Sequence, residues 1–177
     1  MIFSDLFAKK NNFVKNTKMK IAIVYATKYG TTKKVAEKIQ SEIGIEKVQL
    51  FNLKEFDKID LSQFDSIFIG GSIYAGRIQK KVSEFCRKNS VSLLRKRLGL
   101  FICCMYEGEI AEQQIKTAYP EILLNYATSI KVLGGDIMFD KMNFFEKVII
   151  KKVSGVKESI SNINYTKITE MIIEMNK

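Results

Sequence analysis

Residues 21–43 read IAIVYATKYGTTKKVAEKIQSEI, an apolar run, a short polar loop and an amphipathic segment in direct succession. The unbroken apolar run of residues 21–25 is typical of a strand covered on both faces of a parallel sheet. The apolar side chains of residues 32–43 recur at helical spacing, and Gly44 is a suitable helix stop. This stretch therefore predicts a strand followed by a crossover helix.

The rest of the chain repeats this alternation. Further strands are expected at 47–51, 66–70, 98–105 and 130–133, and helices at 80–89, between the last two strands with a break at Pro120, and at 166–176. The half-polar pattern of residues 47–51 indicates an edge strand. Five strands alternating with helices predict an α/β fold, a parallel sheet with right-handed crossovers and helices on both faces.

Composition excludes several classes of protein. The 177 residues, 46% hydrophobic and 27% charged, suit one folded domain and exclude a largely disordered chain. The absence of histidine excludes a Ser-His-Asp triad, a Cys-His dyad and a histidine-ligated metal site, and no metal site is expected. The three cysteines, in a chain without a secretory signal, favour a reduced cytoplasmic setting, with Cys103 and Cys104 as small core side chains.

The formal charge of +10 gathers in two segments. Residues 1–18 carry +3 and residues 141–157 carry +4, which leaves +3 for the remainder. We expect residues 1–18 to form a disordered or amphipathic extension, and Met19, directly before the first strand, could equally be the natural start. Residues 19–177 are then one domain with a basic helical insertion at about 136–160.

The insertion is expected to form an amphipathic helix. Its apolar side is predicted to carry Phe144, Phe145, Val148, Ile149 and Val153, and its other side Lys147, Lys151 and Lys152. Three interpretations stay open. The helix could rest on an anionic membrane as a peripheral contact, its lysines could attract a carboxylated ligand, or it could pack its apolar side onto the sheet.

Three loops follow the carboxyl ends of expected strands, where open parallel sheets bind ligands. The first loop contains Thr27, Lys28, Tyr29, Gly30, Thr31 and Thr32. Its hydroxyls and the N–H groups of the following helix N-terminus suit a phosphate monoester, although threonines are also ordinary helix caps.

The second and third loops each bring an aromatic side chain next to a glycine. The second contains Ser72, Ile73, Tyr74, Ala75 and Gly76, and the third contains Met105, Tyr106, Glu107 and Gly108. Arg77 and Ile78 stand where a nucleoside-triphosphate loop needs Lys and Ser or Thr, which excludes that type of site. Together the three loops predict a site for an aromatic mononucleotide whose ring lies between the two tyrosines.

Two of these loops carry a family resemblance. ATKYGTT at residues 26–32 and IGGSIYAG at residues 69–76, in this order of elements, resemble the flavodoxin family. The resemblance covers roughly residues 19–176. It implies a flavodoxin-like three-layer sandwich with sheet order 2-1-3-4-5, and FMN as cofactor, its phosphate in the first loop and its ring between the second and third.

Within that family the chain is most similar to the flavodoxin-type, menaquinone-dependent protoporphyrinogen oxidases. The similarity rests on GSIYAG at residues 71–76 and on the late stretch from GGD at 134–136 through FFEK at 144–147 to VSG at 153–155. It implies an FMN-dependent oxidoreductase of heme biosynthesis that passes electrons from protoporphyrinogen to a quinone, in the cytoplasm or at the inner face of the membrane.

No residue is assigned a catalytic role from the sequence, and Glu107 is the one candidate general base. Two alternatives to the oxidase stay open. One is a flavodoxin-like electron carrier with a redox-protein partner, and the other is a basic α/β binding module without flavin. Nucleic acid is not the expected partner, because most of the excess charge lies outside the expected flavin site.

Overall fold

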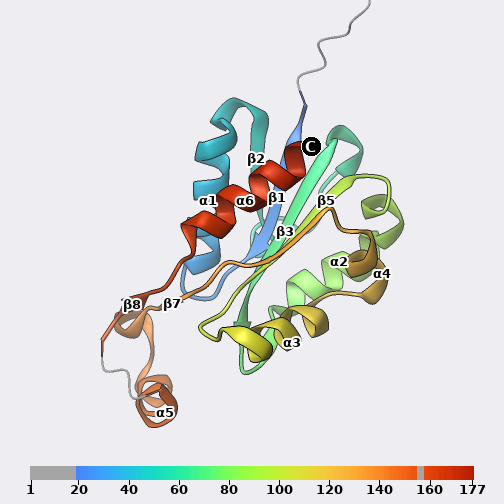
Figure 1. Ribbon diagram of the computed structural model, residues 1–177. Coiled ribbons are helices and arrows are strands. Elements are labelled where there is room, and N and C mark those ends of the chain that lie inside the picture. Colours follow the sequence, from blue (N-terminus) through green and yellow to red (C-terminus); the bar gives the residue numbers. More distant parts are fainter. Residues whose placement is uncertain (1–18, 155–157) are drawn as a thin grey trace, which may run out of the picture.

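The computed structural model describes residues 19–154 and 158–177 (Figure 1). The expected extension at 1–18 lies outside the described residues. Strand β1 (Ile21–Ala26) is buried along its whole length. It pairs in parallel with β2 (Val48–Asn52) on one side and with β3 (Ser66–Tyr74) on the other. The apolar run that opens the domain is thus an interior strand, as expected.

The remaining parallel strands extend the sheet beyond β3. Strand β5 (Arg97–Cys103) pairs with β3, and β6 (Ser129–Val132) pairs with β5, which gives the order β2-β1-β3-β5-β6. Counting only the parallel strands, this is the expected order 2-1-3-4-5, with β2 at an edge as predicted. A short strand that the sequence pattern did not predict, β4 (Arg77–Ile78), folds back antiparallel onto β3.

Helices cover both faces of the sheet, as Figure 1 shows. Helices α1 (Thr31–Ile43) and α6 (Tyr165–Asn176) pack on one face, and α2 (Lys80–Leu93), α3 (Gly108–Ala118) and α4 (Glu121–Tyr126) pack on the other. Alternate residues of β1 enter the two cores: Ala22 and Val24 face α2, while Ile21 and Ile23 face α1. The expected helix break at Pro120 separates α3 from α4.

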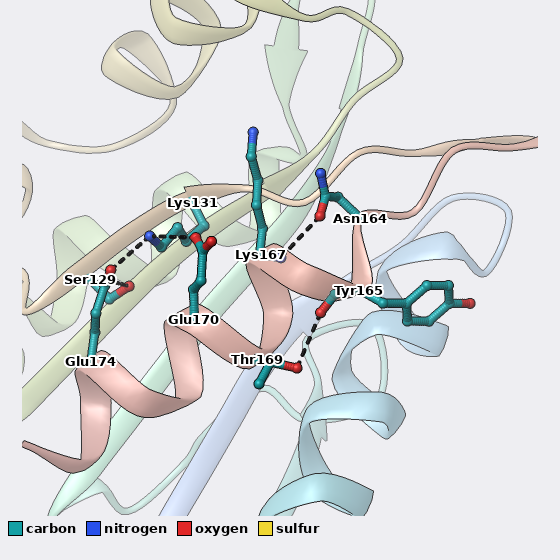
Figure 2. Close-up of polar contacts among 8 residues, drawn as sticks. All are labelled: Ser129, Lys131, Asn164, Tyr165, Lys167, Thr169, Glu170 and Glu174. Carbon is teal, nitrogen blue, oxygen red and sulfur yellow. Dashed lines mark hydrogen bonds and ion pairs between the residues drawn. The ribbon is translucent and has the colours of Figure 1, made fainter.

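A polar network fastens α6 to β6 (Figure 2). The Nζ atom of Lys131 lies 2.7 Å from Glu174 Oε1 and 3.3 Å from Glu170 Oε2, and the Ser129 hydroxyl donates to Glu174 Oε2 at 2.6 Å. Hydrogen bonds from Lys131 and Ser129 lower the pKa of Glu174 below its ordinary value. The Asn164 side chain accepts from the Lys167 amide and caps the start of the helix.

The insertion at 136–160 contains one helix between non-helical segments. Strands β7 (Asp136–Ile137) and β8 (Ile160–Ser161) pair antiparallel at its two ends. Between them lie a 3₁₀ turn, η3 (Phe139–Lys141), and helix α5 (Phe144–Ser154). The paired ends turn the insertion into a loop closed at its base.

Helix α5 lies apart from the sheet and its flanking helices in Figure 1. Phe144, Phe145 and Val148 are 75%, 78% and 48% exposed, so these three side chains do not pack onto the sheet. Of the three lysines predicted on the other side of the helix, Lys152 does not fit the separation. A rotation of about 100° per residue puts Lys152 between Val148 and Phe145 on the helix surface, and all three side chains are exposed. The side chains of Ile149 and Val153 lie outside the described ones.

None of the helices in the described parts of the chain combines the length and the apolar character that crossing a membrane requires.

Candidate functional site

A cavity of about 670 Å³ lies where β1, β3 and β5 end. Most of the predicted site residues line it: Thr27, Lys28, Tyr29, Thr31, Ser72, Ile73, Tyr74, Ala75, Gly76, Met105 and Tyr106. The parallel pairing of the three strands accounts for this convergence, since it brings their carboxyl ends to one edge of the sheet.

Four predicted residues do not line the cavity: Gly30, Thr32, Glu107 and Gly108. The Thr32 side chain is completely buried and lies against the Cys103 thiol, so its hydroxyl points into the core. The Gly30 amide already donates to Thr27 Oγ1 at 2.9 Å. Glu107 is exposed at the residue before α3, which places the candidate general base outside the cavity wall.

The N-terminus of α1 stands at the first loop, and its first N–H groups have no partner within the helix. Gly30 is its cap residue, at φ +108°, and as a glycine it supplies no side-chain cap. The threonines of this loop are therefore not ordinary helix caps here. The first turn contains no acidic residue, and Thr31, which lines the cavity, is its first residue. Backbone N–H groups and the positive end of the helix dipole are thus available to an anion.

Two tyrosines stand on the other two loops. Tyr74 and Tyr106 both line the cavity and are 46% and 47% exposed. A tight turn with Ala75 and Gly76 at positive φ joins β3 to β4 and fixes the second loop. In this arrangement the Lys28 ammonium lies 3.3 Å from the ring centroid of Tyr74. The face of Tyr74 is therefore a surface on which a cationic or flat aromatic group can stack.

The cavity has a fourth wall that the sequence pattern did not predict. It comes from the base of the insertion and consists of Gly135, Asp136, Ile137, Met142, Ile160 and Asn162. Cys103, Cys104 and Gln114 complete the lining, and the buried Gln114 Oε1 has no hydrogen-bond donor among the residues that the structure describes. One signal was available, because Gly134-Gly135-Asp136 follows the last parallel strand at the same edge of the sheet. The contribution of Ile160 depends on β7–β8 pairing, which no local pattern indicates.

Two contacts hold the insertion against the first loop. Lys34 Nζ on α1 lies 2.9 Å from Oδ2 of Asp136, whose side chain is only 1% exposed, and the Ser161 hydroxyl donates to Asp136 Oδ1 at 2.7 Å. From η3, Lys141 Nζ donates to the Tyr29 carbonyl at 3.4 Å. The insertion is thus part of the cavity rather than an appendage beside it.

The thiols at the cavity are not activated. Burial raises the pKa of Cys103 to about 12, although the Thr32 hydroxyl acts in the opposite direction, and burial also raises the pKa of Cys104. Both side chains therefore remain neutral thiols near pH 7. Over the described ranges, His, Cys, Asp and Glu side chains form no cluster that could hold a metal ion. The cavity offers binding groups rather than a nucleophile.

The comparisons with known proteins agree with this architecture. The family described as "Flavodoxin domain" matches residues 22–163. A search of curated proteins found no match.

Two solved structures illustrate the likeness of fold. The flavodoxin of Fusobacterium nucleatum, bound to flavin mononucleotide, is 16% identical with a TM-score of 0.54, over 89% of this chain and 96% of that one. The rubredoxin oxygen:oxidoreductase of Desulfovibrio gigas is 13% identical with a TM-score of 0.50, over 89% of this chain and 34% of that one. This chain thus spans about a third of the second protein.

Proposed function

The chain belongs to the flavodoxin family, and on this premise we propose that it binds FMN in the cavity and acts as a redox flavoprotein. One observation carries the proposal: the uncapped N-terminus of α1 and two half-exposed tyrosines surround a single cavity of about 670 Å³. The cavity therefore joins donors for a phosphate to surfaces for a flat ring.

The chemistry of the lining suits both ends of this cofactor. The N–H groups at the start of α1, with the Thr31 side chain beside them, would hold the phosphate. The rings of Tyr74 and Tyr106 would contact the flavin, and the buried Gln114 Oε1, which lacks a protein donor, would accept a ligand N–H. FMN supplies one- and two-electron transfer when bound, and the protein supplies its position and surroundings.

The visible spectrum of the purified protein tests the proposal directly. We expect a yellow protein, or an apo-protein that takes up FMN in a 1:1 ratio with quenching of the flavin fluorescence. A colourless protein that leaves the fluorescence of added FMN unchanged would contradict it and would favour a binding module without flavin.

As the specific activity we propose oxidation of protoporphyrinogen with a quinone as acceptor. The resemblance at residues 71–76 and 134–155 supports this choice. So does the apolar fourth wall of the cavity, because Ile137, Met142 and Ile160 offer an apolar surface to a second flat molecule. The lysines of α5 lie on the same insertion and suit the carboxylates of a porphyrin.

Turnover of protoporphyrinogen by the FMN-loaded protein with a menaquinone analogue tests this activity. Loss of six electrons and six protons from protoporphyrinogen should match the formation of three reduced quinones. If instead no turnover occurs and a flavodoxin reductase reduces the protein, the chain is an electron carrier for another redox enzyme.

We also propose that α5 is a peripheral contact with an anionic membrane, where a quinone is found. Two phenylalanines that are at least three-quarters exposed lie on a helix with exposed Lys151 and Lys152. Aromatic side chains can enter the boundary between headgroups and acyl chains, while lysines pair with acidic headgroups.

A further inference from the structure

We infer that Lys141, a residue of the insertion, binds the phosphate of the cofactor together with the N-terminus of α1. This inference rests on the proposed binding of FMN and adds a residue to it from outside the three loops. It gives the insertion a direct role in cofactor binding, separate from any role of α5.

The position of Lys141 is the first argument. Its Nζ lies 3.4 Å from the Tyr29 carbonyl, and it would lie 3.8 Å from a Cβ placed on Gly30, the cap residue of α1. The side chain therefore reaches over the loop that precedes the helix. The turn that carries it is closed by a hydrogen bond from the Lys141 amide to the Met138 carbonyl at 2.9 Å.

The base of the insertion is held in register with α1 as well. Asp136 accepts hydrogen bonds from both Lys34 and Ser161, and these join β7, β8 and the first turn of the helix. Lys141 is only five positions beyond Asp136 along the chain. Its backbone is therefore held near the N-terminus of α1.

The charges around α1 supply the second argument. A cation at the positive end of a helix is unfavourable unless an anion lies between them. Lys33 pairs with Glu37 at 3.7 Å and Lys34 pairs with Asp136, so these two lysines have partners. Among the side chains that the structure describes, no carboxylate forms an ion pair with Lys141, and the first turn of α1 has no acidic residue.

A bound phosphate monoester would offset the unfavourable approach of Lys141 to the positive end of α1. Its negative charge would lie between the helix N-terminus and the Lys141 ammonium and would interact favourably with both. A neutral ligand of the same ring system would gain nothing from Lys141. The inference therefore predicts a contribution that depends on the phosphate group alone.

The test compares FMN with riboflavin, which lacks the phosphate, on the apo-protein and on Lys141→Met. Methionine keeps an unbranched side chain and removes the charge. The dissociation constant for FMN should rise by about tenfold, as expected for one charge-assisted hydrogen bond. That for riboflavin should change by less than about twofold. Lys116→Met is the matched control, since Lys116 is exposed on α3, which packs on the other face of the sheet from α1.

The effect should also depend on salt. The ratio of FMN affinities between the parent protein and Lys141→Met should shrink as ionic strength rises, because screening weakens the ammonium–phosphate attraction. Equal losses for FMN and riboflavin, or no loss for FMN, would overturn the role of Lys141 while leaving FMN binding intact. A parent protein that binds neither flavin would instead overturn the proposed function itself.

Discussion

Lys34 and Asp136, 102 residues apart in the sequence, form an ion pair of 2.9 Å between the first turn of α1 and the start of β7. The Asp136 side chain is buried, whereas the Lys34 side chain is half exposed. Since the second carboxylate oxygen accepts from Ser161, both Asp136 oxygens are satisfied by the protein. The pair therefore attaches the insertion to the element that starts the candidate phosphate site.

Asp136→Asn should loosen this attachment. The change removes the ion pair and leaves Lys34 without its carboxylate, so the free energy of unfolding should fall by about 1–2 kcal/mol. Lys33→Met, which breaks an exposed pair on the same helix, should cost no more than about 0.5 kcal/mol. Urea unfolding measures both. Equal losses of unfolding free energy in the two variants would mean that the burial of Asp136 does not strengthen its ion pair.

Tyr74→Ala should weaken FMN binding by about fivefold to tenfold, because it removes an aromatic surface from the cavity. Tyr74→Phe should keep most of the affinity, since stacking needs the ring and not the hydroxyl. Tyr126→Ala, at a tyrosine that is 45% exposed on α4 and outside the cavity lining, is the control. Fluorescence titration gives the dissociation constants, and an unchanged value for Tyr74→Ala would remove this tyrosine from the site.

Gly134→Ala should destabilise the turn that leads into the insertion. Gly134 has φ +73°, and an added Cβ would lie 1.9 Å from the Asn162 carbonyl oxygen, which is backbone and cannot rotate away. Gly108→Ala shares a positive φ of 58° but meets no atom within 4 Å. Gly108→Ala should lower the free energy of unfolding by about 1–2 kcal/mol, because alanine is strained in left-handed backbone. Gly134→Ala should lower it clearly more, because the close contact adds to that strain. Similar losses in thermal or urea unfolding would show that the close contact is relieved easily.

Membrane binding through α5 should depend on both its phenylalanines and its lysines. The parent protein should sediment with vesicles that contain phosphatidylglycerol and not with pure phosphatidylcholine vesicles. A Phe144→Ser/Phe145→Ser variant and a Lys147→Glu/Lys151→Glu/Lys152→Glu variant should each bind several-fold less. Lys116→Glu, which changes one exposed lysine on α3, should bind nearly as the parent does. Unchanged binding by the triple variant would exclude α5 as the contact.

The network of Figure 2 predicts a pH-dependent contribution from Glu174. Its pKa is lowered by Lys131 and Ser129 from the ordinary value of 4.5, so the ionised form is favoured in the folded protein. Glu174→Gln should therefore lower the free energy of unfolding, by about 0.5 kcal/mol because solvent screens this partly exposed pair. The full difference in free energy of unfolding between the parent protein and Glu174→Gln should be present above pH 4.5. It should vanish as the pH falls through the lowered pKa of Glu174 in the folded protein. A difference that persists at pH 2 would show that charge is not its origin.

Local pattern determined much of the fold. The apolar run at 21–25, the helical spacing of 32–43 and the half-polar edge at 47–51 each report burial on one or two faces, which a one-dimensional pattern encodes directly. The three predicted loops also converge as expected, because parallel strands end at one edge. The observed ends of some strands differ by a few residues from the predicted ones, because strand pairing continues past the apolar run. Strand β3, for example, extends to Tyr74.

The direction in which individual side chains point was harder to predict from the sequence. Thr32 belongs to the phosphate-loop pattern, yet helical geometry turns its hydroxyl toward Cys103 and the core. Glu107 follows a buried strand, yet it is exposed and outside the cavity lining. Both outcomes depend on the packing of neighbouring elements, which a motif of consecutive residues does not describe.

The sequence alone thus determined the succession of parallel strands and their main helices, the edge at which the three candidate loops meet and the basic character of the insertion. Only the tertiary structure decided that the insertion forms the fourth wall of the cavity and that Lys141 reaches the start of α1. The physical reason is the distance along the chain. The pairing of Asp136 with Lys34 and of β7 with β8 joins residues that have no local signal for each other, and their contact exists only once the sheet and α1 are in place.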